Sequence, residues 1–155
     1  MSARDTEHNS EATVLKVKVL RPGAKLPERG SAGATGYDLY ACLDDLGAII
    51  IEDKPELVPT GIALEVPPGY DAQIRPRSGL FARGVAVALG TIDSDYRGEV
   101  LVTMYLLPST PRYEVKHGDR IAQLVISRVA DVPLVEVEEL SETERGNRGH
   151  GSTGM

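Results

Sequence analysis

Hydrophobic and polar residues alternate in short runs along most of this chain, a pattern typical of half-buried β-strands. Within residues 14–20, apolar side chains stand at the odd positions from Leu15 to Val19, and lysines stand between them. Glycine and proline separate this run from similar ones, as in the turn at 67–69. We expect strands over residues 14–20, 36–41, 48–51, 57–66, 70–75, 85–89, 100–107, 113–116, 121–129 and 134–137.

Helical periodicity is scarce, and residues 79–83 could form a short helix. Short strands with turn signals at this spacing predict an all-β sandwich or barrel. Residues 1–12 are too polar to pack and are expected to be a disordered leader. From residue 141 the large hydrophobic side chains disappear until Met155, and glycines recur. We therefore expect residues 13–140 to form the β domain and residues 141–155 to form a flexible arm.

Composition narrows the class of protein. A chain of 155 residues with 41% hydrophobic residues is expected to form one domain with its own core. Because no apolar run could span a bilayer and the polar N-terminus does not resemble a signal peptide, we expect a cytoplasmic protein without a membrane partner. A net charge of −6 argues against long nucleic acid as a partner. The lone Cys42 excludes an internal disulfide and is interpreted as a buried residue.

The segment 90–99 carries more chemistry than a turn requires. It holds Asp93, Asp95, Tyr96 and Arg97 between two expected strands. Because side chains two residues apart in extended backbone point the same way, one aspartate could polarise a water while the other pairs with Arg97. Taken alone, paired aspartates in a loop are more often turn formers, and a lone tyrosine is more often core packing. The segment by itself leaves a catalytic and a structural role open.

Anion donors gather at two further places in the interior of the chain. The Arg-Ser-Gly sequence at 77–79 follows one expected strand and opens the short helix, where backbone N–H groups, a hydroxyl and a guanidinium come together. Gln123 enters another strand and could reach a phosphate oxygen. Each site has a simpler interpretation, because a helix cap or a solvated glutamine has the same sequence. Asp119 and Arg120 could form only a surface ion pair of little energetic value.

The C-terminal arm could be a flexible terminus, which is the usual interpretation of a glycine-rich end. It nevertheless carries Arg145, His150, Ser152 and Thr153, which are an anion donor, an aromatic ring and two hydroxyls. If the arm closes over a ligand, these side chains could clamp and cover it, and the glycines would let the backbone approach closely. The three histidines of the chain are too scattered to predict a zinc site.

Five segments of the chain, taken in order, resemble the five sequence motifs of the trimeric deoxyuridine triphosphatases (dUTPases). The resemblance covers most of the chain, from about residue 14 to residue 154. The segments that resemble motifs one to five are residues 34–40, 76–80, 90–99, 118–123 and 145–154.

That resemblance implies an all-β jelly roll assembled as a homotrimer with an exchanged C-terminal arm. One subunit would contribute motifs one, two and four to each active site, a second would contribute motif three, and the third would lend its arm. The implied reaction is Mg²⁺-assisted hydrolysis of dUTP to dUMP and pyrophosphate, which keeps uracil out of DNA and supplies dUMP for thymidylate synthesis. Asp93 would activate the water that attacks the α-phosphate, and Asp38 would reach the water shell of a Mg²⁺ ion held mainly by the substrate.

The resemblance also implies the contacts with dUTP. The phosphates would be bound by Arg77, Ser78, Gly79 and Gln123, with Arg145, Ser152 and Thr153 closing over the γ-phosphate. The nucleoside would be held by Gly90, Thr91, Ile92 and Tyr96, with Tyr96 against the deoxyribose. Uracil would be read by backbone groups of Val87, Ala88, Leu89 or Leu101 and covered by His150 and Gly151.

Three features depart from the family pattern. His150 stands where phenylalanine is common, so a smaller and titratable ring would stack on uracil. The expected uracil hairpin at 85–89 is short and lacks asparagine, which leaves recognition to backbone groups. Arg148 replaces what is often glycine and could add a phosphate contact or be solvated.

Two other functions remain open on the sequence. A dCTP deaminase, or a bifunctional deaminase and diphosphatase, shares the implied fold, but the tyrosine of segment 90–99 and the Arg/Gly arm resemble the diphosphatase. A non-catalytic jelly-roll trimer that binds nucleotide is the second alternative, and it would not need the base that Asp93 supplies.

Overall fold

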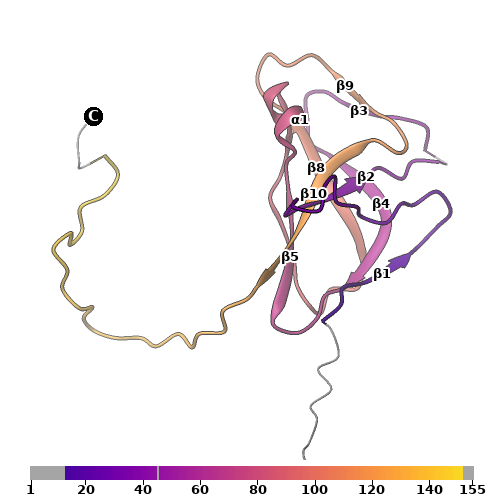
Figure 1. Cartoon of the computed structure of the whole chain (residues 1–155). Helices are drawn as coiled ribbons and strands as arrows, with labels where there is room; N and C mark the ends of the chain where they lie inside the picture. The colour runs from indigo at the N-terminus through magenta and orange to yellow at the C-terminus, as the bar shows by residue number, and fades with distance from the viewer. Residues whose placement is uncertain (1–12, 45, 152–155) are drawn as a thin grey trace, which may run out of the picture.

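Short alternating runs become strands throughout the described part of the chain (Figure 1). The computed structural model describes residues 13–44 and 46–151, which form ten strands and one short helix. The strands are β1 (Lys16–Val19), β2 (Tyr37–Tyr40), β3 (Ile49–Ile51), β4 (Glu56–Glu65), β5 (Tyr70–Arg75), β6 (Val85–Val87), β7 (Gly90–Ile92), β8 (Glu99–Leu106), β9 (Tyr113–Val115) and β10 (Arg120–Arg128). The helix α1 (Ser78–Ala82) connects β5 to β6.

The strands build two four-stranded sheets and one two-stranded sheet. The first sheet has the order β1-β4-β8-β6, and the second has the order β2-β10-β5-β7. Strands β3 and β9 pair separately. All of these pairings are antiparallel, which confirms the predicted all-β architecture.

One hydrophobic core joins the two sheets. Val58 and Val102 of the first sheet and Leu124 of the second are fully buried and belong to the same cluster of packed side chains. Each such side chain contributes about 1.5–3 kcal/mol by leaving water, so this cluster dominates the stability of the sandwich. Cys42 is buried as predicted.

The order of strands in the second sheet matters most for function. It brings together β2, β10, β5 and β7, which come from the regions of four separate sequence clusters. Residues on alternate positions of these strands share the sheet face that points away from the core. The residues with candidate chemistry therefore lie on a common scaffold.

The expected strands differ from the observed ones in two places. Residues 90–92 form β7, which pairs with β5, although Gly90 favours a loop at this point. Residues 134–137, expected to be a strand, are not one, and Leu134 is completely exposed. This prediction is wrong for the single chain because a strand needs a neighbour to pair with, and the alternation alone does not supply one.

The chain leaves the sandwich after β10 (Figure 1). Residues 129–151, which we call the C-terminal extension, contain no described helix or strand and are almost entirely exposed. The leader at 1–12, predicted to be disordered, lies outside the described residues, as do Ser152 and Thr153. In the part of the chain that the structure describes, no helix is both long and apolar enough to cross a membrane.

Candidate active site

The phosphate-binding candidates meet at one end of the second sheet. In the register of the strands, Gln123 of β10 lies opposite Asp38 of β2 on one side and opposite Arg75 of β5 on the other. Arg77 follows β5 closely and is the N-cap residue of α1. Asp38, Arg77, Arg120 and Gln123 form a group that we call the basic cluster.

Asp38 is the anionic centre of the basic cluster. Its Oδ1 lies 3.3 Å from Nε of Arg77, and its Oδ2 lies 3.8 Å from Nε of Arg120. The Asp38 side chain is only 17% exposed, whereas the two arginines are more open. Two guanidinium groups around one half-buried carboxylate leave a net positive site, which suits an anionic ligand.

Gln123 is held in place by its surroundings. Its Nε2 donates a hydrogen bond to the carbonyl oxygen of Pro76 at 3.0 Å. Its side chain also lies against Gly36, where any added Cβ would collide with Oε1 of Gln123. Gly36 is therefore required next to Tyr37 and Asp38, because a larger residue would displace the glutamine.

Arg120 was not expected to belong to the site. The sequence allowed a surface pair with Asp119, but Asp119 instead accepts a hydrogen bond from the backbone N–H of Lys116 at 2.8 Å. A register irregularity between Arg120 and Ala122 in β10 breaks the simple alternation. Strict alternation would place Arg120 and Gln123 on opposite faces, so periodicity alone could not have found this contact.

The nucleoside candidates form a second site. A cavity of about 230 Å³ is lined by the side chains and backbone of Ile74, Gly90, Thr91, Ile92, Asp93, Tyr96, Glu99, Val100 and Leu101. We call it the nucleoside pocket. Ala88 and Leu89 precede this pocket without lining it. The N–H of Ala88 donates to the carbonyl oxygen of Thr103 at 2.9 Å, so that N–H is not available to read a base.

Hydrogen bonds among its own residues and to the start of β8 hold the segment between β7 and β8 in place. The N–H of Tyr96 donates to the carbonyl of Asp93 at 3.1 Å, and the Tyr96 hydroxyl donates to the carbonyl of Glu99 at 3.0 Å. The ring of Tyr96 passes over Gly98, where a Cβ would collide with its hydroxyl end. These contacts fix Asp93 and Tyr96 relative to one another within each chain.

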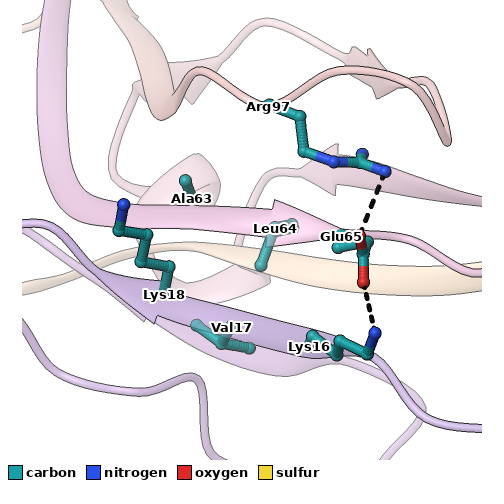
Figure 2. Close-up of a pocket in the computed structure, with 7 residues that line it drawn as sticks. All are labelled: Lys16, Val17, Lys18, Ala63, Leu64, Glu65 and Arg97. Carbon is teal, nitrogen blue, oxygen red and sulfur yellow. Dashed lines mark hydrogen bonds and ion pairs between the residues drawn. The ribbon is translucent and has the colours of Figure 1, made fainter.

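Arg97 secures the same segment from outside. It donates to the carbonyl of Ser94 at 2.6 Å and lies 3.5 Å from a carboxylate oxygen of Glu65. Figure 2 shows Glu65 between Arg97 and Lys16, in a separate hollow on the ladder of β1 and β4. The idea that an aspartate of 90–99 pairs with Arg97 is therefore wrong, because Glu65 takes that place.

Asp93 and the basic cluster of the same chain lie apart. Asp93 follows Ile92, which pairs with Ala72, so Asp93 stands level with Asp71 on β5. Gln123 pairs with Arg75, further along that strand. At ~3.4 Å per residue the offset along the strand is about 14 Å, and Arg77 lies beyond that end. One chain therefore does not bring the expected base to its own phosphate site.

The described arm residues, 141–151, extend away from both sites of their own chain (Figure 1). Arg145 and Arg148 bond to each other's backbone, with Nε of Arg145 donating to the carbonyl of Arg148 at 2.9 Å. His150 is exposed and has a positive φ of 49°. Gly151 follows it as the last described residue of the C-terminal extension.

Comparison with known proteins identifies the family. The dUTPase family model matches residues 23–154. The deoxyuridine 5'-triphosphate nucleotidohydrolase of Hydrogenobaculum sp. (strain Y04AAS1) is 51% identical over 144 residues, covering 91% of this chain and 98% of the relative. The enzyme of the same name from Caldanaerobacter subterraneus subsp. tengcongensis is 48% identical over 149 residues, covering 92% and 98%.

Solved structures agree with the sequence relatives. The dUTPase of Staphylococcus bacteriophage 80alpha, solved with dUPNHPP, superposes with a TM-score of 0.77 at 27% identity, covering 92% of this chain and 99% of the phage chain. These likenesses favour the hydrolase over the deaminase and over a non-catalytic nucleotide binder. With its two antiparallel sheets, the chain thus belongs to the dUTPase family of jelly-roll enzymes and hydrolyses dUTP to dUMP and pyrophosphate.

Proposed function

We propose that dUTP is hydrolysed at sites shared between the copies of a homotrimer. The single observation that carries this proposal is the separation between Asp93 and the basic cluster within one chain. A neighbouring copy can bring its own Asp93 and nucleoside pocket to this cluster. The exposed apolar residues Val132, Leu134, Val135 and Val137 further support contact with another copy, because such a run is costly to leave in water.

In the proposed reaction, Asp93 is the general base. It is exposed beside the nucleoside pocket and accepts a proton from a water whose oxygen attacks the α-phosphorus. The bond between the α-phosphorus and the oxygen that bridges to the β-phosphate then breaks. Pyrophosphate leaves with that oxygen, and dUMP is the other product. Such a base contributes a factor of about 10²–10⁴ to the rate.

The basic cluster is the proposed triphosphate site. Arg77 and Gln123 offer N–H donors, and Ser78 and Gly79 add a hydroxyl and the unpaired N–H groups of a helix start. Arg77 and Arg120 already neutralise Asp38. A polyanion at this cluster would draw Arg77 toward its oxygens, and positioning with charge neutralisation would supply most of the acceleration.

Mg²⁺ fits this donor set if the substrate brings most of the ligands. No described group of three or more His, Cys, Asp or Glu residues is placed to hold a metal. Asp38 is nevertheless a carboxylate at the triphosphate site, and Mg²⁺ commonly keeps several waters while binding substrate phosphates and one or two carboxylates. We assign Asp38 to the water shell of the ion, which when bound would neutralise triphosphate charge.

The nucleoside pocket is the proposed deoxyuridine site. Tyr96 forms one wall, where its ring would pack against the deoxyribose and leave no room for a 2′-hydroxyl. Gly90, Thr91, Ile92 and Leu101 are among the other residues that line the pocket. Uracil recognition would rest on backbone groups around Leu89 and Leu101, since a wrong base would leave buried polar groups unpaired at about 1–3 kcal/mol each.

The arm at 141–155 is the proposed cover of a neighbouring site. Arg145, His150 and Gly151 lie on an extension that leaves the sandwich of its own chain, and they would close over the γ-phosphate and the base in another copy. We further propose that the enzyme works in the cytoplasm, because nucleoside triphosphates are made and used inside the cell.

The replacement Asp93→Asn tests the catalytic role. We expect kcat to fall by about 10²–10⁴ while binding of a non-hydrolysable dUTP analogue is kept, because the amide has the same shape but cannot take the proton. Asp95→Asn is the matched control, since Asp95 is a neighbouring exposed carboxylate that does not line the nucleoside pocket. Full turnover by Asp93→Asn, measured as pyrophosphate release, would refute this role.

A further inference from the structure

Glu99 makes a set of contacts that its place in the sequence does not predict. It is the first residue of β8 and directly follows the segment that carries Asp93 and Tyr96. Its Oε1 lies 2.7 Å from Nη2 of Arg21 and 2.8 Å from the backbone nitrogen of Gly61. The Glu99 side chain is 25% exposed, so this carboxylate is largely withdrawn from water.

Gly61 needs the Glu99 carboxylate because of an irregularity in β4. The pairing of β4 with β8 shifts between Pro59 and Ala63, and Gly61 adopts a positive φ of 71° there. Gly61 is buried, and its N–H donates to the carboxylate of Glu99. Beside it, the Thr60 hydroxyl donates to the carbonyl of Val100 at 2.6 Å. Side chains thus replace ladder hydrogen bonds at this bulge.

Arg21 holds the other side of the carboxylate. Its Nη2 also lies 3.4 Å from the carbonyl oxygen of Cys42, so it ties the start of β8 to two other segments of the chain. The hydrogen bond with Glu99 raises the pKa of the Arg21 guanidinium above its usual range. The guanidinium therefore stays charged at any pH at which the enzyme works.

The backbone of Glu99 in turn holds Tyr96. Its carbonyl oxygen accepts the Tyr96 hydroxyl at 3.0 Å, and the tyrosine ring is confined against Gly98. Tyr96 and Glu99 both line the nucleoside pocket. A shift of the Glu99 backbone would move the hydroxyl end of the ring, and with it the wall of the pocket.

We propose that Glu99 is a positioning residue that sets the preference for deoxyribonucleotides over ribonucleotides. Arg21 and Gly61 hold its side chain, and its carbonyl holds the Tyr96 ring at the sugar. This inference depends on the proposed contact between Tyr96 and the deoxyribose. It goes further by assigning the accuracy of that contact to a residue that acts through the Tyr96 ring.

The test compares dUTP with UTP in Glu99→Ala, Glu99→Gln and Tyr96→Phe. For Glu99→Ala we expect KM for dUTP to rise about fivefold or more, and the ratio of kcat/KM for dUTP to that for UTP to fall about tenfold, because the ring loses its fixed position. Glu99→Gln should recover most of this ratio, since its amide oxygen still accepts the Gly61 N–H. Tyr96→Phe removes only the hydroxyl bond and should lower the ratio in the same direction.

Glu56→Ala is the matched control, because Glu56 lies on β4 and pairs with Lys54 at 3.8 Å, away from the pocket. Melting temperature is measured for every variant. If Glu99→Ala has a lower melting temperature but keeps the wild-type ratio of kcat/KM for dUTP to that for UTP, the inference is overturned and Glu99 is structural only. If Glu99→Ala does not fold, Tyr96→Phe decides, and a wild-type ratio in that variant overturns the inference. Tyr96→Ala tests the proposed contact with the sugar separately from the role of Glu99. An unchanged ratio in Tyr96→Ala would mean that Tyr96 does not contact the deoxyribose.

Discussion

The segment at 93–99 and the C-terminal extension at 129–151 both carry candidate site residues, yet they are held in opposite ways. The first is bonded to its own chain through Tyr96, Arg97 and Glu99, and its partners include Glu65 of β4 and Arg21 in the bend after β1. The second is exposed along nearly its whole length, and Arg145 and Arg148 bond only to nearby backbone. The nucleoside pocket is therefore formed within one chain, whereas we expect the arm to find its contacts on another copy.

Of the changes that test this difference, removal of the arm should have the largest effect on dUTP hydrolysis. We expect deletion of residues 145–155 to leave the sandwich and the trimer intact, because the core lies wholly before residue 129. Hydrolysis of dUTP should fall by about 10²-fold or more, since closure over the substrate supplies positioning and excludes water. Steady-state kinetics and sedimentation check this, and normal turnover by the truncated enzyme would show that the arm covers nothing.

A smaller effect is expected from His150→Phe, which changes only the ring that we propose to cover uracil. A phenyl ring stacks over a larger area, so activity should be retained or rise within about threefold. The measurement is kcat/KM for dUTP in both enzymes. A marked fall in kcat/KM would contradict stacking of the ring at position 150 over the base.

The smallest effect concerns Glu65, which pairs with Arg97 of the segment at 93–99 and with Lys16. Hydrogen bonding to Lys16, with the charge of Arg97 nearby, lowers the pKa of Glu65 below its usual value of 4.5 (Figure 2). A carboxyl group whose pKa is lower in the folded state than in the unfolded state stabilises the fold at pH values above its unfolded-state pKa. That stabilisation is lost as the pH falls through the pKa of the folded state. Wild type should therefore melt slightly higher than Glu65→Gln at neutral pH.

That difference between wild type and Glu65→Gln should vanish as the pH is lowered through and below 4.5. Because the Glu65 side chain is well exposed, the shift is expected to be small and to weaken further in high salt. Calorimetry across this pH range checks both statements. A gap in melting temperature that persists well below the folded pKa would mean that Glu65 acts through packing and not through its charge.

The sequence predicted what depends on local pattern. Alternation located most strands, and the Arg-Ser-Gly segment and Gln123 predicted anion donors that the strand order gathers at one sheet end. It failed where contacts depend on register. The irregularity in β10 that brings Arg120 to Asp38, and the one in β4 that pairs Gly61 with Glu99, have no signature in alternation.

The pairing of Arg97 with Glu65 was missed for a related reason. The two residues stand 32 positions apart and meet only because the end of β4 lies beside the segment that follows β7. The opposite error occurred at 134–137, where a good strand pattern pairs with no strand among residues 13–44 and 46–151. Pairing between strands distant in sequence, or between copies, is information that a single pattern of hydrophobic residues does not contain.

The sharing of sites between copies is tested most directly by mixing two inactive variants. Asp93→Asn lacks the base and Arg77→Ala lacks a phosphate donor, so each trimer alone should be almost inactive. After joint unfolding and refolding at equal amounts, about a quarter of the sites should combine an intact Arg77 from one copy with an intact Asp93 from another, and activity should return to that level. If the mixture stays as inactive as its parts while forming mixed trimers, the base and the phosphate site belong to the same chain, which would contradict the sharing of sites between copies.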